Sequence, residues 1–278
     1  MYGALIGDIV GSSHEFGEDV ETKNFPLFDE DSSFTDDTVM TVAVAEALLE
    51  LKKDATREEI MNEVELSMRK WGRKYPNAGY GGSFICWLNQ NSPKPYGSYG
   101  NGSAMRVSAA GWLYESLERT REVARATAEV THNHPEGIKG AEAVASAIFL
   151  ARNGISKEQI KKYIENEFQY NLNRSIEEIK PVYFFNEICQ KTVPEAIICF
   201  LEAKNFEDAI RTAVYLDGDT DTLAAIAGSI AEAYFRVPRK LIKVCEKMVD
   251  KDMLEILKMI RCRKRYGARK LISQQLGY

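Results

Sequence analysis

Residues 217–235 read DGDTDTLAAIAGSIAEAYF and join a dense acidic turn directly to an apolar helical pattern. A second segment of the same kind, TDDTVMTVAVAEALLEL at residues 35–51, lies about 180 residues earlier in the chain. In both segments the apolar residues recur every three or four positions, which is the period of a helix with a buried face. Each acidic cluster therefore stands at the start of a predicted helix.

Carboxylates this close together repel one another unless water or a cation lies between them. Asp and Thr offer the oxygen ligands that Mg²⁺ and Mn²⁺ prefer. The same residues also cap helix starts, which is the simpler interpretation of either cluster alone. Because two adjacent carboxylates exceed what a cap requires, we expect the clusters to share a dinuclear metal site. The predicted metal ligands are Thr35, Asp36, Asp37, Asp219, Asp221 and Thr222.

The rest of the chain is also helical in character, and alternating strand patterns are nearly absent. Capping boxes at 56–59 and 156–159 mark two helix starts, and Gly154 and Gly218 mark breaks between helices. We therefore expect an all-α fold, a compact single-domain orthogonal helical bundle over residues 1–278, with the metal site at helix termini. The predicted helical segments are 38–52, 56–75, 104–117, 119–130, 138–152, 156–168, 193–203, 205–215, 222–235 and 238–260.

The composition is that of a soluble globular protein, with 45% hydrophobic and 28% charged residues in 278. No apolar run reaches the ~20 residues that span a bilayer, and the first residues lack the basic segment of a signal peptide. The five cysteines show no Cys-x-x-Cys spacing, which favours free thiols in a reducing cytosol. We expect a cytoplasmic monomer with no membrane contact.

Charge is unevenly distributed along the chain. Residues 236–278 hold 13 Lys and Arg against 4 Asp and Glu, whereas the whole chain has a net charge of −5. We interpret this basic end as a solvated helix face, with nucleic acid or an acidic partner as the alternative.

Two further segments contain candidate functional residues. Residues 3–11 carry a glycine at every fourth position, which predicts a helix that packs closely against a neighbour, and Glu15 follows in a polar loop without an obvious ion-pair partner. The loop 97–103, GSYGNGS, combines three glycines with a predicted helix start and suits an anion, although the Lys of a Walker motif is missing. This loop belongs to the longest irregular segment, 76–103, and a second irregular segment covers 168–192.

The segment 131–135, THNHP, contains two of the three histidines of the chain. Its His-x-His spacing suggests zinc, but no third nitrogen or sulfur ligand is evident. We expect this turn to form hydrogen bonds with a ligand instead.

In this order, these segments resemble the ADP-ribosylglycohydrolases, the family of the dinitrogenase reductase-activating glycohydrolase. The resemblance extends from residue 3 to residue 235 and implies an all-α fold with two Mg²⁺ or Mn²⁺ ions on the six ligands named above. The matching segments are GALIGDIVGSSHEF, FTDDT, GSYGNGSAMRVS, THNHPEGIKGAEAVASAIFLAR, TVPEAIICFLEA and GDTDTLAAIAGSIAEAYF.

The resemblance also implies roles for single residues. Glu15 corresponds to a glutamate in a mobile loop beside the metals, which makes it the first choice for an acid/base or gating residue, with Asp36 and Asp219 as further catalytic residues. His132 contacts the ligand, and Tyr99 lies near the adenosine. The implied diphosphate-binding residues are Gly97, Ser98, Tyr99, Gly100, Asn101 and Gly102.

One position departs from the family pattern. Such proteins usually have Gly-Gly-Asp where this chain has Asp217-Gly218-Asp219. The extra side chain at position 217 is expected to alter the turn or to add a carboxylate outside the metal ligands.

The implied reaction is hydrolysis of the bond at the anomeric carbon of the distal ribose, which releases ADP-ribose through an oxocarbenium-like state. The cations are expected to bind the ribose hydroxyls and activate water, while Glu15 or an Asp handles the proton. A non-catalytic ADP-ribose-binding protein and a dinuclear nucleotide phosphohydrolase are the alternatives. The linkage stays open between arginine, serine, nucleic-acid and small-molecule acceptors, which loops 12–34 and 76–96 are expected to contact.

Overall fold

A computed structural model describes the backbone of residues 1–17 and 20–276 and the side chains of residues 1–17 and 20–263. Every regular element within these ranges is helical, and the one strand-like contact is an isolated antiparallel bridge between Gly100 and Ile188. The predicted all-α class is thereby confirmed. No helix in the same part of the chain has the length and apolarity needed to cross a membrane.

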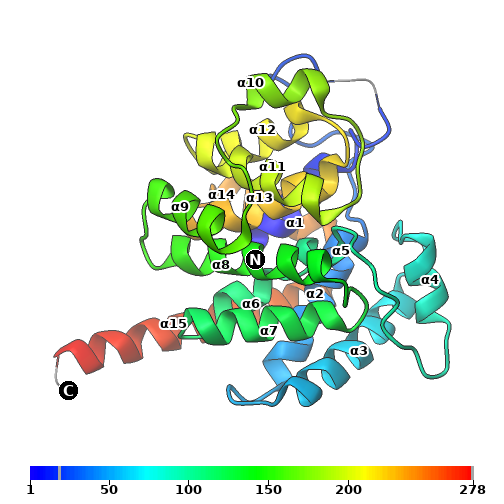
Figure 1. The fold of residues 1–278 in the computed structure, drawn as a ribbon, viewed down its shortest axis with the longest axis vertical. Helices are drawn as coiled ribbons and strands as arrows, with labels where there is room; N and C mark the ends of the chain where they lie inside the picture. Colours follow the sequence, from blue (N-terminus) through cyan, green and yellow to red (C-terminus); the bar gives the residue numbers. More distant parts are fainter. Residues whose placement is uncertain (18–19, 277–278) are drawn as a thin grey trace.

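Figure 1 shows the arrangement of the helices. In chain order they are α1 (Tyr2–Gly11), α2 (Asp36–Glu50), α3 (Arg57–Lys74), α4 (Gly82–Leu88), α5 (Gly102–Met105), α6 (Ser108–Leu113), α7 (Leu117–Glu129), α8 (Pro135–Arg152), α9 (Lys157–Phe168), α10 (Ile176–Ile179), the short 3₁₀ helix η1 (Lys180–Val182), α11 (Cys189–Glu202), α12 (Phe206–Leu216), α13 (Thr220–Tyr234), α14 (Arg239–Met248) and α15 (Lys251–Leu276).

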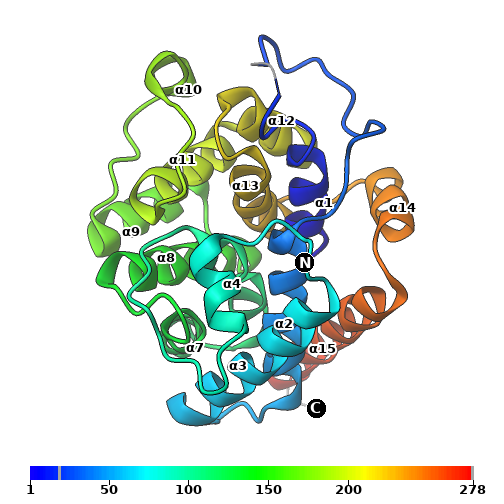
Figure 2. The same cartoon turned by 90° about the vertical axis from the view of Figure 1, so that its right-hand side faces the viewer.

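Helix α13 lies in the middle of the molecule, with α1, α8, α11 and α12 packed around it (Figure 2). Its residues are buried from Thr220 to Ala231. Most of these residues are Ala, Gly, Ser or Thr, so neighbouring helices approach closely on several sides. The apolar side chains of this and the surrounding helices form one contiguous hydrophobic cluster.

The glycines of α1 bring that helix directly against α13. A Cβ atom added to Gly3 or Gly7 would lie 2.0 Å from a backbone oxygen of α13, and one added to Gly11 would lie 2.4 Å from the Cα of Asp221. Real Cβ atoms do not approach other atoms this closely, so only glycine fits these positions. The predicted close packing of segment 3–11 is confirmed, and it places the residues after α1 beside the start of α13.

The predicted start and stop signals are found in the structure. Reciprocal capping boxes begin α3 at Thr56 and α9 at Ser156. Gly154 and Gly218 have φ angles of +78° and +84°, a conformation that glycine adopts without steric cost, and each follows the end of a helix.

Two predicted helices are each divided in two, so these predictions are wrong in part. Segment 104–117 forms α5 and α6, which are separated by Arg106 and Val107, and the side chain of the buried Arg106 reaches Thr131 after α7. Segment 238–260 forms α14 and α15, which are separated by Val249 in an extended conformation. The second break lets the first part of α15 pack against α2 and α6.

The irregular segments are shorter than predicted. Segment 76–103 contains α4, whose Phe84, Trp87 and Leu88 are buried, although seven residues are too few to show a clear period. Segment 168–192 contains α10 and η1, and α11 begins within it. Residues 18 and 19 of loop 12–34, residues 277 and 278 of the predicted domain, and the basic side chains after residue 263 lie outside the described residues.

Candidate active site

The starts of α2 and α13 lie side by side and bring the two acidic clusters together. The Thr35 hydroxyl precedes α2 and donates a hydrogen bond of 3.2 Å to Oδ2 of Asp221 on α13. In the opposite direction, the Thr222 hydroxyl donates a bond of 3.1 Å to Oδ2 of Asp37 on α2. The hydroxyls thus link clusters that lie about 180 residues apart in the chain.

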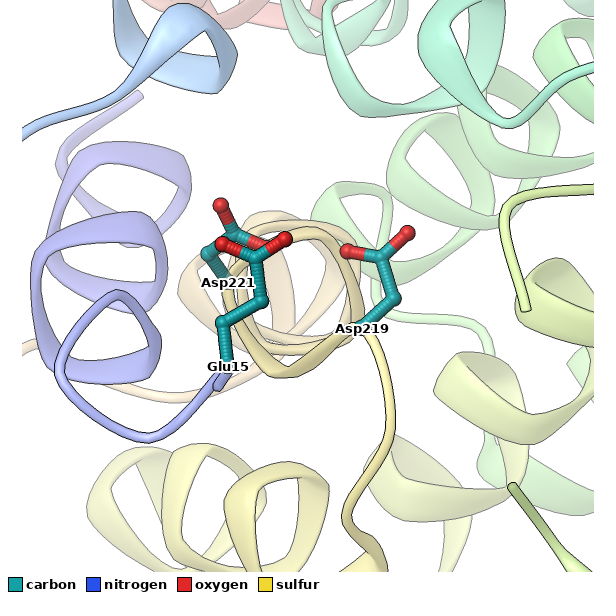
Figure 3. Close-up of side chains that lie close together, drawn as sticks. All are labelled: Glu15, Asp219 and Asp221. Atoms are coloured by element: carbon teal, nitrogen blue, oxygen red, sulfur yellow. The ribbon is translucent and has the colours of Figure 1, made fainter. Parts of the chain in front are cut away.

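Three carboxylates converge on one space at this junction. Asp219 and Asp221 extend from the start of α13, and Glu15 reaches the same space from the turn after α1 (Figure 3). One oxygen of each of the three lies within 4.8 Å of those of the others. This separation leaves room for a bound ion between them.

Asp8 belongs to the site, although the sequence analysis did not select it. It is fully buried in α1, where its Oδ2 accepts hydrogen bonds of 3.0 Å from the backbone N–H groups of Thr35 and Thr38. Its Oδ1 lies 2.7 Å from the Thr35 hydroxyl oxygen, which accepts the hydrogen of the carboxyl group when Asp8 is protonated. Asp8 therefore fixes the start of α2 against α1. A carboxylate inside the otherwise apolar helix of residues 2–11 was the available signal.

Burial and repulsion raise the pKa values of the carboxyl groups. Burial, followed by the charge of Asp221, raises the pKa of Asp8 to about 7. Burial also raises the pKa of Glu15 to about 8, with additional contributions from the charges of Asp221, Asp8 and Glu187. Without positive charge nearby, both groups hold protons in conditions under which an exposed carboxyl group is ionised.

The other acids of the two clusters are affected in the same way. Burial, and then the charge of Asp221, raises the pKa values of Asp36, Asp37 and Asp219 well above their usual range. Oδ1 of Asp37 is buried and has no hydrogen-bond partner within the described residues. No ion pair in that part of the chain includes any of these acids. Within the described residues the cluster therefore has no ion-paired cation, although the charge of Arg106, which lines the same cleft, acts on Asp36.

A cleft with a volume of about 310 Å³ is lined by Glu15 and by the four aspartates of the two clusters, but not by Asp8. Gly79, residues 81–84 at the start of α4, Arg106 and Glu187 contribute further to its lining. Glu187 was not predicted, and its backbone oxygen accepts a hydrogen bond of 2.7 Å from the Asn101 N–H. The cleft is large enough for a small organic ligand.

Only four of the six predicted ligand-binding residues of the glycine loop line the cleft. Ser98, Gly100, Asn101 and Gly102 line the cleft, whereas Gly97 and Tyr99 are not among its lining residues in the described structure. The Tyr99 side chain is 48% exposed and contacts the ring of His134.

The backbone of the loop is largely engaged within the protein. The N–H groups of Gly97, Gly100 and Asn101 donate to Asn133 Oδ1, Ser98 Oγ and the Glu187 oxygen, respectively. The Asn101 side chain donates a 2.5 Å bond to Oδ2 of Asp219, which connects the loop to the acidic cluster.

His132 and His134 have separate positions. His132 is 5% exposed, lines the cleft, and its Nδ1 lies 2.7 Å from the Thr131 hydroxyl oxygen. His134 caps α8, where its Nδ1 accepts a hydrogen bond from the Glu136 N–H. The His-x-His spacing therefore serves a cleft and a helix start rather than one metal ion.

Asp217 occupies an unusual backbone conformation beside the site. Its φ of 76° and ψ of −173° belong to a region that is populated almost only by glycine. Gly218 follows with φ of +84°, so two consecutive residues have positive φ angles in the turn that leads to Asp219. The side chain at 217 therefore adds strain to a turn that glycine would form freely.

Comparisons with known proteins show which family and fold the chain resembles. Residues 1–269 match the model of a family described as ADP-ribosylglycohydrolase. ADP-ribosylhydrolase ARH3 of Mus musculus is 29% identical over 333 aligned positions, covering 91% of this chain and 88% of the relative. ADP-ribosylarginine hydrolase Tri1 of Pseudomonas putida is 27% identical, covering 85% and 70%. A solved chain of an ADP-ribosylglycohydrolase-related protein complex shares the fold, with a TM-score of 0.69, 22% identity and coverage of 93% and 94%.

Proposed function

The chain belongs to the ADP-ribosylglycohydrolase family, and on this premise we propose that it is a metal-dependent hydrolase that releases ADP-ribose from modified proteins or small molecules. The observation that carries the proposal is the convergence of carboxylates without an ion-paired cation in a cleft that the glycine loop and His132 also line. A cleft of this kind suits a ligand with hydroxyl groups near cations and an anionic diphosphate near neutral donors.

The residues present fit a pair of hard divalent cations. All candidate donors are carboxylate or hydroxyl oxygens, and the unpartnered Oδ1 of Asp37 is a buried oxygen that still lacks a positive partner in the described structure. When bound, Mg²⁺ or Mn²⁺ would supply positive charge that holds ribose hydroxyls and acidifies water. The residues that would hold the two ions are Thr35, Asp36, Asp37, Asp219, Asp221 and Thr222.

In the proposed reaction, water attacks the anomeric carbon of the distal ribose. The bond from this carbon to the acceptor nitrogen or oxygen breaks, a new C–OH bond forms, and the acceptor leaves with a proton. One proton of the attacking water passes to a carboxylate, and this proton, returned directly or through solvent, is the one with which the acceptor leaves. We assign this transfer to Glu15, because it borders the cluster from a turn rather than from a helix and its raised pKa makes its carboxylate form a stronger base.

The remaining residues position the substrate. Asn101 is tied to Asp219 by its side chain and to Glu187 by its backbone, so it holds the glycine loop at a fixed distance from the acids. Binding of the diphosphate at this loop would hold the ribose in place for the reaction. Loops 12–34 and 76–96 remain the proposed contacts of the acceptor.

Substitution of Glu15 tests the assignment. With Mg²⁺ and a serine- or arginine-ADP-ribosylated peptide, Glu15→Gln should lower kcat roughly 100-fold or more while the affinity for ADP-ribose is retained. Glu255→Gln is the matched control, because Glu255 is an exposed glutamate of α15 that does not line the cleft, and it should leave kcat unchanged. Equal kcat values for Glu15→Gln and the wild-type protein would exclude Glu15 as the proton-transfer residue.

The reaction product distinguishes the alternatives. Chromatography of the reaction mixture should show free ADP-ribose and unmodified peptide. Release of phosphate or of a mononucleotide would instead indicate a phosphohydrolase, and binding of ADP-ribose without turnover would indicate a non-catalytic member of the family. A panel of arginine, serine, nucleic-acid and small-molecule linkages would identify the acceptor.

A further inference from the structure

Arg106 is a fully buried cation at the lining of the cleft, with 1% of its surface exposed. Its Nη2 donates a 2.8 Å hydrogen bond to the Thr131 hydroxyl oxygen and a weaker one of 3.4 Å to the Thr127 oxygen. No carboxylate forms an ion pair with it among the described residues. Because a guanidinium group can only donate, Thr131 must accept from it.

Because Thr131 accepts from Arg106, the direction of its second hydrogen bond, to His132, can be inferred. Thr131 is completely buried, and besides Arg106 its oxygen contacts only Nδ1 of His132, at 2.7 Å, within the described structure. If Nδ1 carried a hydrogen, Thr131 would accept twice and its own buried hydrogen would have no acceptor. If Nδ1 is bare, Thr131 donates to it and every group is satisfied.

The satisfied arrangement places the hydrogen of the imidazole on Nε2. This atom has no hydrogen-bond partner in the described part of the protein, and His132 lines the cleft. Nε2 lies next to the glycine loop. A Cβ atom added to Gly102 would be 3.2 Å from Nε2, and one added to Gly100 would be 3.5 Å from Nε2. Burial, together with the charge of Arg106, lowers the pKa of His132 well below its usual value, so the ring stays neutral.

We propose that Arg106 and Thr131 are positioning residues that hold His132 in the neutral tautomer with hydrogen on Nε2, so that this N–H is a preset donor to an anionic oxygen of the ligand. The identity of that oxygen as part of a diphosphate rests on the proposed function, whereas the tautomer does not. A neutral donor of fixed direction binds the ligand without bringing a second cation next to Arg106.

The tautomer can be measured directly by long-range ¹H–¹⁵N NMR on labelled full-length protein, because the chain has only three histidines. The His132→Gln variant assigns the signals. The expected wild-type pattern is a protonated Nε2 and an unprotonated Nδ1 at neutral pH. A protonated Nδ1, or an imidazolium, in the wild-type protein would overturn the proposal even if no variant folds.

Two substitutions of Thr131 then test whether its hydroxyl sets the tautomer of His132. Thr131→Val removes the hydroxyl at nearly constant volume and should shift His132 toward the Nδ1–H tautomer, whereas Thr131→Ser keeps the hydroxyl and should keep the wild-type pattern. The thermal unfolding midpoint of each variant shows whether it is folded. An unchanged pattern in folded Thr131→Val would contradict the role of Thr131.

Binding of ADP-ribose, measured by calorimetry, links the tautomer to the ligand. Thr131→Val should raise Kd roughly tenfold, and Thr131→Ser should leave it within about twofold of the wild-type value. If both variants bind like the wild-type protein, His132 is not a tautomer-dependent donor to the ligand. If the wild-type protein does not bind ADP-ribose, the proposed function fails, and the NMR result still decides the tautomer.

Discussion

Replacing Asp8 with Asn is expected to change how the stability of the cation-free protein depends on pH. Burial and the charge of Asp221 raise the pKa of Asp8 from 3.8 to about 7, and such a rise corresponds to about 4 kcal/mol of stability. Because the pKa is higher in the folded state, this stability is fully present below about pH 4 and is lost as pH rises through about 7. The free energy of unfolding of the wild-type protein in EDTA should therefore receive a decreasing contribution from Asp8 between about pH 4 and about pH 7.

The Asn variant is a close structural replacement. The amide oxygen of the variant can occupy the place of Oδ2 and accept from the N–H groups of Thr35 and Thr38. The amide nitrogen can occupy the place of Oδ1 and donate to the Thr35 hydroxyl, whose hydrogen then points to Asp221. We expect the variant to fold and to lack the pH-dependent loss that the Asp8 carboxyl group causes.

Urea unfolding at pH values from 5 to 8, in EDTA, measures the effect as the difference between the wild-type protein and Asp8→Asn. His14 and His132 act in the opposite direction, because burial lowers their pKa values and their contributions are lost as pH falls. Both proteins contain them, so they cancel in the difference. The unfolding free energy of Asp8→Asn, relative to wild type, should rise by about 2.5 kcal/mol from pH 5 to pH 8, because part of the total loss of about 4 kcal/mol already occurs below pH 5. Parallel curves for the two proteins would refute the electrostatic reasoning.

Three further predictions concern packing, strain and cations. Gly7→Ala should destabilise the protein by about 3 kcal/mol in urea unfolding, because its Cβ would lie 2.0 Å from the Ala224 oxygen; a loss below about 0.5 kcal/mol would contradict the packing of α1 on α13. Asp217→Gly should raise the unfolding midpoint by about 2 °C in calorimetry, since relief of about 1–3 kcal/mol of strain exceeds the entropic cost of glycine, and a lowered midpoint would refute this reasoning. Mg²⁺ at about 100 times its Kd should raise the midpoint of the wild-type protein by about 5 °C and should have no comparable effect on Asp36→Asn; equal shifts in both proteins would place the cation elsewhere.

The meeting of the two acidic clusters could be predicted because each carries its own local signal. Asp36 and Asp219 belong to runs that exceed what helix caps require, and both runs precede apolar helical patterns. The glycines of segment 3–11 also predicted a close helix contact, although the sequence did not identify α13 as the partner helix. Local periodicity fixes the elements, whereas the partner of an element depends on distant residues.

The contributions of Asp8 and Arg106 could not be predicted for the same reason. An acid or a guanidinium group within a helical pattern is usually exposed, and its burial depends on partners from other helices. Asp8 is satisfied by the start of α2 and Arg106 by Thr131 after α7. The division of segment 104–117 also lies at Arg106 and Val107, where the sequence has no Gly or Pro to signal a helix end.

The central claim is that the acidic cluster holds cations needed for release of ADP-ribose. It is tested most directly by measuring ADP-ribose release from serine- and arginine-modified peptides with Mg²⁺, after excess EDTA, and after Mg²⁺ is restored. Release that stops in EDTA and returns with Mg²⁺ or Mn²⁺ is the predicted result. Release that continues undiminished in excess EDTA would contradict the account.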